Sequence, residues 1–280
     1  MIEGSESKKT MPDYKPYVEK MAKVGCYSIA VVYFLVGLMA LMGFFGRSDN
    51  GADEERIMDM ILDLPLGEVL IALLIAGLLG YIVWRVYESI TDPYDFGSSA
   101  KGIARRAGIG LSATGYLIIA FAAGQMLLEG GSGNGEEDQQ NMIAQVLEFP
   151  GGPWIVGLVG AITGFAGLVQ FKYVATGDYH KRINFDQMPS WARISTHILS
   201  WWGYMARGVL LAVIGYFLIS AGIESDPEEV GDTDSAFDFL GDLGTFGSTV
   251  FIAVALGTML YGVFMVIHGI YYSFEKESER

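Results

Sequence analysis

The chain has 280 residues, of which 51% are hydrophobic and 13% aromatic, and its formal net charge is −14. The apolar residues lie in long uncharged blocks rather than being spread over amphipathic elements, which excludes an ordinary soluble domain. A single cysteine, Cys26, excludes a disulfide framework and a four-thiolate metal site.

Four uncharged blocks are long enough to cross a bilayer, because a helix of about 20 apolar residues spans the hydrocarbon core. These blocks are residues 24–45, 107–128, 149–171 and 243–274. Two shorter blocks, 69–84 and 208–223, reach that length if Arg85 and Arg207 extend to the headgroups. The pattern predicts an all-α, polytopic integral membrane protein with six transmembrane helices.

Landmark residues recur along these blocks at nearly constant offsets, which indicates an internal repeat. In the first helix of each unit, a glycine precedes a tyrosine by eight residues: Gly25 and Tyr33, Gly108 and Tyr116, Gly208 and Tyr216. In the second helices the matched residues are Gly67 and Tyr81, Gly151 and Phe165, Gly247 and Tyr261. We therefore expect three tandem helical hairpins of the same orientation, with pseudo-threefold symmetry about an axis normal to the membrane.

The expected units follow one another without overlap. They are an N-terminal tail at 1–20, hairpin repeat 1 at 21–90, a linker at 91–103, hairpin repeat 2 at 104–175, a linker with an interfacial helix at 176–203, hairpin repeat 3 at 204–273 and a C-terminal tail at 274–280. Each outer loop carries a short amphipathic segment, at 54–62, 139–147 and 233–240. These segments predict short helices at the outer membrane surface.

The charged residues are divided unequally between the two sides of this topology. The side with both termini holds 16 of the 18 basic residues and 12 of the 32 acidic ones, which gives +4 there and −18 opposite. Basic loops stay in the cytoplasm. We therefore expect a multi-pass protein of the bacterial cytoplasmic (inner) membrane with cytoplasmic N- and C-termini. No basic cluster suits a nucleic acid.

The glycine–tyrosine spacing, the breaks ILDLPLG and VLEFPGG, and the segment GLLGYIVWR resemble a bacterial membrane family known as domain of unknown function 1206. Members of that family carry three tandem copies of a two-helix unit. The resemblance runs from about residue 20 to 273 and departs at the third break, where Thr245 and Phe246 replace the proline. It implies the topology and no activity.

Polar residues inside the spans are the first candidates for a functional site. The alignment of the second helices places Glu88, Lys172 and His268 in one column. Threefold packing would cluster them near the inner mouth, whereas independent helices would leave them among the headgroups. Arg85 is placed to pair with Glu88 at i, i+3, and Gln170 to make an interhelical hydrogen bond.

Tyr33, Tyr116 and Tyr216 form a second set of candidates. They lie about 12 to 18 Å along the first helix of each hairpin. As a ring, they would gate a central path or contact an apolar ligand such as a quinone or a lipid tail. The alternative is that each hydroxyl bonds a backbone carbonyl and stabilises packing.

No catalytic signature occurs in the chain: there is no phosphate-binding loop, dinucleotide-binding glycine motif, zinc-peptidase motif or nucleophile elbow. The sequence therefore predicts a non-enzyme with no cofactor and no metal site. The expected role is a scaffold or accessory subunit of a membrane complex, with membrane lipids and other membrane subunits as partners. The alternative is a small channel, transporter or lipid- or quinone-binding protein around the pseudo-threefold axis, which a solid apolar centre would exclude.

Overall fold

The computed structural model describes residues 15–45, 67–92, 96–129, 135–177, 179 and 183–271, and this part of the chain is helical apart from its connections. The helices are α1 (Lys15–Phe44), α3 (Gly67–Thr91), α4 (Ala100–Glu129), α5 (Gly135–Leu147), α6 (Gly152–Thr176), α7 (Ser190–Glu224), α8 (Thr233–Gly241) and α9 (Gly244–Ile270). Short 3-10 turns, Phe185–Gln187 and Pro227–Glu229, precede α7 and α8. The predicted all-α class is confirmed over these residues.

Five helices of the described residues are long and apolar enough to cross a membrane. They are α1 over residues 22–42, α3 over residues 71–91, and α6, α7 and α9 over their whole length. The predicted sixth span coincides with α4, several of whose side chains lie outside the description. Most of the predicted membrane helices are thus present with the composition that membrane crossing requires.

Two helices extend beyond the predicted boundaries. α1 begins at Lys15, inside the predicted N-terminal tail. α7 runs without interruption from Ser190 to Glu224, so the predicted interfacial helix and the fifth span are one helix of 35 residues. Nothing between Pro189 and Glu224 breaks it, because proline is absent there. As a result Arg207 lies at the middle of α7 and not at its end.

Two of the three predicted surface segments form helices, α5 over 139–147 and α8 over 233–240, and the first, 54–62, lies outside the described residues. Asp232 caps α8 by accepting a hydrogen bond from the Ser235 amide. The predicted break before α6 is also present. Gly151 adopts a left-handed conformation with φ 89°, which glycine tolerates, and Pro153 follows in the first turn of α6.

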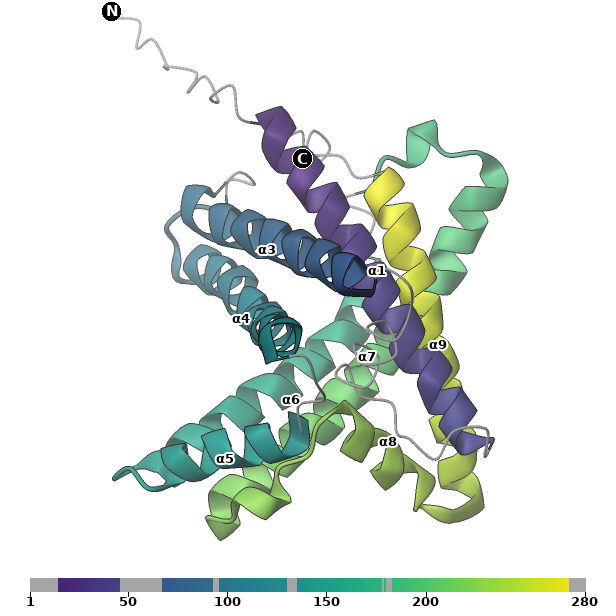
Figure 1. Cartoon of the computed structure of the whole chain (residues 1–280). Coiled ribbons are helices and arrows are strands. Elements are labelled where there is room, and N and C mark those ends of the chain that lie inside the picture. The colour runs from purple at the N-terminus through teal and green to yellow at the C-terminus, as the bar shows by residue number, and fades with distance from the viewer. Residues whose placement is uncertain are drawn as a thin grey trace, which may run out of the picture.

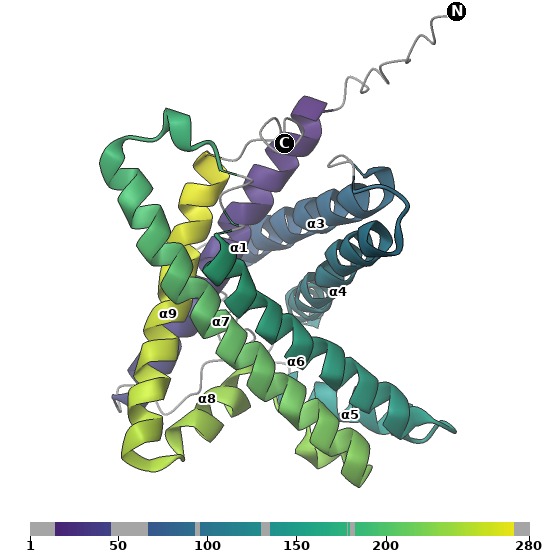
Figure 2. The ribbon, with the colours of Figure 1, turned by 180° about the vertical axis from the view of Figure 1, so that it is seen from behind.

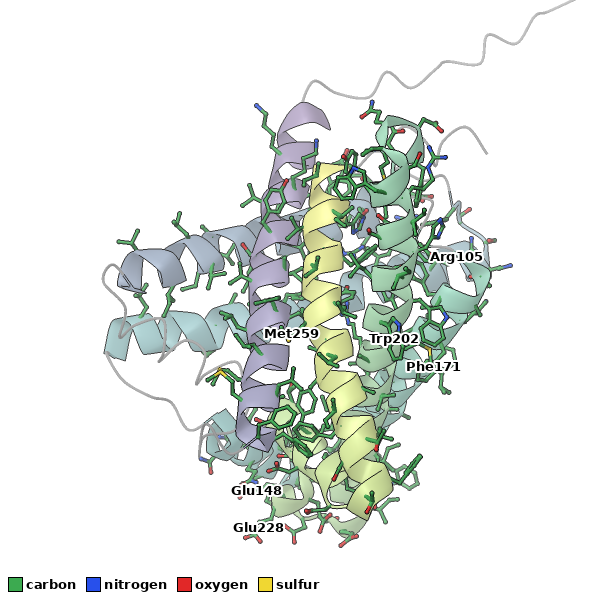
Figure 3. All side chains as sticks on the ribbon, turned by 90° about the vertical axis from the view of Figure 1, so that its right-hand side faces the viewer. Arg105, Glu148, Phe171, Trp202, Glu228 and Met259 are labelled. Carbon is green, nitrogen blue, oxygen red and sulfur yellow. The ribbon has the colours of Figure 1, made fainter. Side chains whose placement is uncertain are left out.

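The long helices pack as three pairs, α1 with α9, α3 with α4, and α6 with α7 (Figure 1). Each pair joins the second helix of one predicted hairpin to the first helix of the next, in cyclic order. The pairs diverge from a shared centre, as the reverse view also shows (Figure 2). In Figure 3, α1 and α9 run upright while α3 extends sideways. The pairs therefore cross instead of forming a parallel bundle.

Contacts within the predicted hairpins are unequal. α1 packs on α3, and α7 packs on α9. Among the described residues, α4 and α6 do not form a closely packed pair. The cyclic arrangement of helices is therefore interrupted between the two helices of the second hairpin.

Candidate functional site

Tyrosine rings from five different helices meet where the three helix pairs cross. They are Tyr33 of α1, Tyr81 of α3, Tyr116 of α4, Tyr204 of α7 and Tyr261 of α9, which we call the tyrosine cluster. Ring centroids lie 4.9 Å apart for Tyr33 and Tyr261, 5.1 Å for Tyr81 and Tyr116, and 5.3 Å for Tyr204 and Tyr261, all edge to face. All but the half-buried Tyr33 are buried. The cluster thus ties helices of all three pairs together through aromatic contacts.

Arg207 points into the tyrosine cluster from the middle of α7. Its Nη1 donates a hydrogen bond of 2.6 Å to the Tyr261 hydroxyl. Its Cζ lies 5.3 Å, 5.5 Å and 6.0 Å from the ring centroids of Tyr261, Tyr33 and Tyr116. Ring faces at these distances stabilise a cation by cation–π attraction. The guanidinium is therefore surrounded by aromatic groups rather than extended to the headgroups, which corrects the expected placement of Arg207 at a span end.

The charge of Arg207 has no partner of opposite sign within the described part of the chain. The side chain is half-buried, and its Nε is inaccessible and lacks a hydrogen-bond acceptor there. No carboxylate of those residues forms an ion pair with it. A buried cation without a counter-charge is costly in a membrane interior. Arg207 is therefore a charged residue of the site whose hydrogen bonds are incomplete within the described part of the chain.

Arg85, by contrast, has a carboxylate partner at the edge of the same cluster. Its Nη1 lies 3.0 Å from Oε2 of Glu88, whose side chain is fully buried. Its Nε donates a hydrogen bond of 2.8 Å to the Tyr81 hydroxyl, and its Nη2 donates to the same oxygen. The predicted i, i+3 pair is confirmed. Tyr81 thus connects a neutralised arginine to the tyrosine cluster.

The packing of glycines on tyrosines defines the true register between the first and third hairpins. Gly25 of α1 lies against Tyr81 of α3, and Gly203 of α7 lies against Tyr261 of α9 in the same way. The offsets are 203 − 25 = 178 for the first helices and 261 − 81 = 180 for the second. The sequence alignment instead matched Gly25 with Gly208, an offset of 183.

This register corrects the predicted tyrosine ring. An offset of 178 aligns Tyr33 with Leu211, not with Tyr216. Tyr216 is 56% exposed and packs against Phe217 and Phe239 at the α7–α8 contact. Tyr33 and Tyr116 do face one guanidinium, but Tyr216 lies elsewhere.

The second hairpin is also shifted relative to the sequence alignment. A Cβ at Gly167 of α6 would lie 2.7 Å from the Gly208 carbonyl oxygen of α7, and a Cβ at Gly262 of α9 would lie 2.6 Å from the Ala30 carbonyl oxygen of α1. These equivalent contacts give an offset of 262 − 167 = 95 residues between the second helices of the second and third hairpins. They again give an offset of 208 − 30 = 178 residues between the first helices of the first and third hairpins. The alignment had used 261 − 165 = 96, so it was displaced by one residue.

The corrected register changes the predicted polar column. His268 aligns with Tyr173 and not with Lys172, because 268 − 95 = 173. Lys172 is exposed and makes no ion pair within the described residues, whereas Tyr173 packs on Tyr204 at 5.0 Å. His268 packs on Phe264 at 5.6 Å. The predicted cluster of Glu88, Lys172 and His268 is therefore wrong at Lys172, since a shift of one residue turns a side chain by about 100° on a helix.

Among the described residues, Gly108 of the second hairpin does not make the glycine–tyrosine contact that Gly25 and Gly203 make in the other two. A Cβ at Gly108 of α4 would have nothing within 4 Å. Gln170 of α6 is half-buried, and it makes no interhelical hydrogen bond among the residues that the structure describes. Next to the tyrosine cluster, the ring of packed helices is therefore interrupted between α4 and α6 in the described part of the chain.

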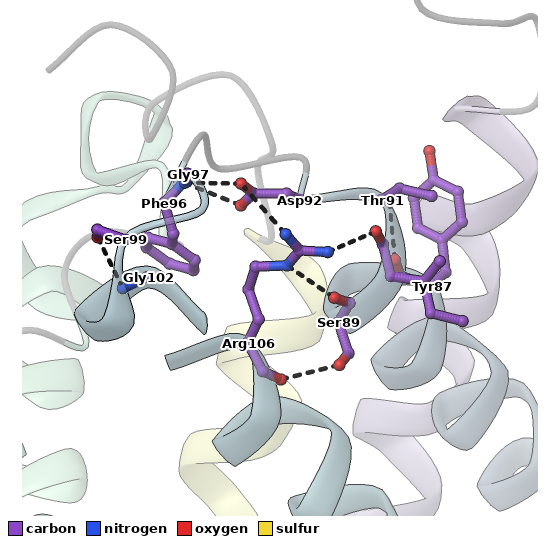
Figure 4. Close-up of polar contacts among 10 residues, drawn as sticks. Tyr87, Ser89, Thr91, Asp92, Phe96, Gly97, Ser99, Gly102 and Arg106 are labelled. Atoms are coloured by element: carbon purple, nitrogen blue, oxygen red, sulfur yellow. Dashed lines mark hydrogen bonds and ion pairs between the residues drawn. The ribbon is translucent and has the colours of Figure 1, made fainter. Parts of the chain in front are cut away.

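A polar network near the ends of α3 and α4 holds this pair together (Figure 4). Nε and Nη2 of Arg106 donate to the carbonyl oxygens of Ser89 and Ile90 at 2.9 Å and 2.7 Å. The Ser89 hydroxyl donates back to the Arg106 carbonyl oxygen at 2.9 Å. Asp92 accepts from the Phe96 amide at 2.9 Å and lies 4.0 Å from Arg106. These bonds satisfy the last carbonyl groups of α3.

Comparison with known proteins agrees with the repeat seen in the helices. The family described as Domain of Unknown Function (DUF1206) matches three segments, at residues 24–92, 107–177 and 202–272. The chain belongs to this family. It is also 30% identical over 263 residues to the uncharacterized protein YxxB of Bacillus subtilis (strain 168), which covers 94% of each chain. No solved structure matches it significantly. The first and third matched segments start 178 residues apart. The equivalent glycines Gly25 and Gly203 are separated by the same number of residues.

Sequence reasoning missed Arg207 and the tyrosines of the second helices. The signal for Arg207 was present, because the apolar residues continue on both sides of it, from Ile194 to Ile223. A charged residue inside such a stretch indicates a site. In the sequence, Tyr81 and Tyr261 are recognisable only as landmarks of the repeat.

Proposed function

We propose that this chain is a non-enzymatic, multi-pass protein of the bacterial cytoplasmic membrane that binds an amphiphile, a lipid or a quinone, at the tyrosine cluster. Five described helices suited to membrane crossing and the excess of basic residues on one side support this location and cytoplasmic termini. With α4, the chain has six spans.

The observation that carries the binding function is the environment of Arg207. Its guanidinium has one hydrogen bond, to Tyr261, and an Nε without an acceptor among the described residues. A helix with a purely structural role does not need a charged group at its middle, because an apolar residue packs there with a smaller desolvation free energy. A bound polar group supplies the missing acceptor. Arg207 therefore favours ligand binding over a purely structural role.

The pseudo-threefold arrangement is part of the same proposal. The pairs α6–α7 and α9–α1 share one register, as the contacts of Gly167 and Gly262 indicate. The pair α3–α4 follows the same cyclic order. Among the described residues α4 and α6 do not pack closely, which breaks the symmetry on one side, and in this proposal the ligand approaches the tyrosine cluster from there.

The test is to identify what the purified protein carries. The full chain is extracted in mild detergent, and its bound amphiphiles are separated and identified by mass spectrometry. We expect about one amphiphile per chain, depleted in Arg207→Gln and retained in Arg105→Gln, since Arg105 is exposed and outside the tyrosine cluster. A protein that carries no amphiphile and is not stabilised thermally by added lipid or quinone would contradict the proposal.

The scaffold or accessory role is the second candidate. α6 is the least covered of the five candidate spans, with exposed residues such as Trp154 and Phe165 along it. A partner subunit on α6 would cover this face, and the complex would survive purification. Repeated recovery of the chain alone from mild detergent would count against this role.

A further inference from the structure

We propose that the headgroup held at Arg207 carries a single negative charge, so that the ligand is an anionic amphiphile such as a fatty acid or an acidic phospholipid. This inference rests on the binding function proposed above and specifies its ligand class. A neutral quinone or alcohol is not expected to occupy the site.

The charges around the tyrosine cluster set the charge of the ligand. Arg85 is paired with Glu88 at 3.0 Å, so together they contribute no net charge. Arg207 has no carboxylate partner among the described residues, and it leaves one positive charge in the same region. One anionic group balances that charge, whereas a neutral headgroup leaves it uncompensated.

The edge of the guanidinium that Tyr261 does not contact carries two donors whose spacing matches an anion with two oxygens. Nη1 is used by the Tyr261 hydroxyl, and this is the one hydrogen bond that the guanidinium makes in the described part of the chain. Nε and Nη2 form the opposite edge, and Nε, which is buried, has no acceptor among the described residues. Carboxylate and phosphate oxygens accept two parallel hydrogen bonds from such an edge. The geometry thus suits a carboxylate or a phosphate.

The tyrosines around Arg207 fit the same ligand. The Tyr261 hydroxyl accepts from Arg207 and keeps its own proton for an anion oxygen. The rings of Tyr33 and Tyr116 exclude water from the guanidinium, which strengthens a charge pair formed there. Tyr116 belongs to α4, which does not pack closely on α6 among the described residues, and in the proposed binding mode the hydrocarbon tail lies on this side.

The experiment compares headgroups that differ in charge but share a tail. Affinity for the full purified chain in neutral detergent is measured with oleate against oleyl alcohol, and with phosphatidylglycerol against phosphatidylcholine. We expect the anionic member of each pair to bind more tightly by about 10-fold or more. Acetate and inorganic phosphate are added separately as free anions, and we expect them to bind far more weakly because they bury no tail.

Variants locate the effect at Arg207. Arg207→Gln is expected to weaken oleate binding by about 10- to 100-fold, and Arg207→Lys to keep part of it, because lysine retains the charge without the paired edge. Arg105→Gln is the matched control and is expected to bind oleate as the wild type does. The wild-type headgroup comparison stands even if Arg207→Gln does not fold.

Each alternative outcome has a distinct meaning. Equal binding of oleate and oleyl alcohol would overturn the anionic headgroup and leave the amphiphile-binding function intact. Free phosphate binding as tightly as phosphatidylglycerol would overturn the lipid source of the anion. The absence of binding by every amphiphile would overturn the proposed function itself.

Discussion

Arg85 and Arg207 both lie within long apolar helices, but among the residues that the structure describes Arg85 has a carboxylate within reach and Arg207 does not. Glu88 is three residues away on the same helix, so local sequence suffices to pair them. The surroundings of Arg207 come from Tyr33, Tyr116 and Tyr261 on three other helices. The first environment is a property of a sequence segment and the second a property of the assembled protein.

The buried Glu88 gives a prediction at the residue scale. Glu88→Gln removes the counter-charge of Arg85 and should lower the free energy of unfolding by about 3–5 kcal/mol, because breaking one partner of a buried pair leaves the other uncompensated. The double variant Arg85→Met with Glu88→Leu should recover most of that loss. The measurement is thermal unfolding of the purified chain in detergent.

Glu148→Gln is the control for this prediction, since Glu148 is exposed and lies outside the site. Its unfolding temperature should match that of the wild type. If Glu88→Gln behaved like Glu148→Gln, the pair with Arg85 would not contribute to stability.

At the scale of the helices, close packing depends on a few small residues. Gly25 and Gly203 allow α1 and α7 to approach the tyrosine-bearing faces of α3 and α9. Gly108 has the same position in the second hairpin, and a Cβ built there would have no described atom within 4 Å. Equivalent glycines thus have different neighbours, because α4 packs on α3 and α6 packs on α7.

This difference predicts opposite effects for the same substitution. In Gly203→Ala, the new Cβ would lie 2.8 Å from Cα of Tyr261, a backbone atom that cannot turn aside. We expect a loss of stability of about 1–3 kcal/mol. Gly108→Ala should be neutral or stabilise by up to about 1 kcal/mol, because alanine favours a helix over glycine.

Unfolding of both variants in detergent, followed by circular dichroism, distinguishes these expectations. Equal destabilisation by the two alanines would indicate that α4 and α6 close on each other as the other hairpins do.

At the scale of the whole molecule, the distribution of basic residues predicts the orientation in the membrane. Glu148 and Glu228 lie at the same end of the molecule (Figure 3). Glu148 precedes α6 and Glu228 follows α7, and both lie on the strongly acidic side of the predicted topology. From the positive-inside rule we expect this end to lie outside the cytoplasm.

Cysteine labelling tests the orientation. In a Cys26→Ala background, which removes the one native thiol, single cysteines replace Glu148, Glu228 or the exposed Lys101. A membrane-impermeant maleimide should label the first two in intact cells and Lys101→Cys only after permeabilisation. The reverse pattern would contradict cytoplasmic termini.

The sequence by itself determined the all-α class, the apolar helices, the repeat and the Arg85–Glu88 pair, because each depends on residues that are close in the chain or on blocks of one composition. The start of α1 at Lys15 was less predictable, since polar residues continue a helix as readily as apolar ones do. The repeat was recognised, but its register was wrong by up to five residues.

Only the tertiary structure decided which residues meet. The register follows from contacts such as Gly203 with Tyr261, which depend on the close approach of backbones far apart in sequence. A shift of five residues in the third hairpin moves Tyr216 out of the tyrosine cluster, and a shift of one in the second moves Lys172 to the surface. The sequence predicts Arg207 at the end of a span, whereas in the structure tyrosines from three other helices surround it. The physical reason is that hydrophobicity is local, whereas the position of a charge depends on the packing of every helix around it.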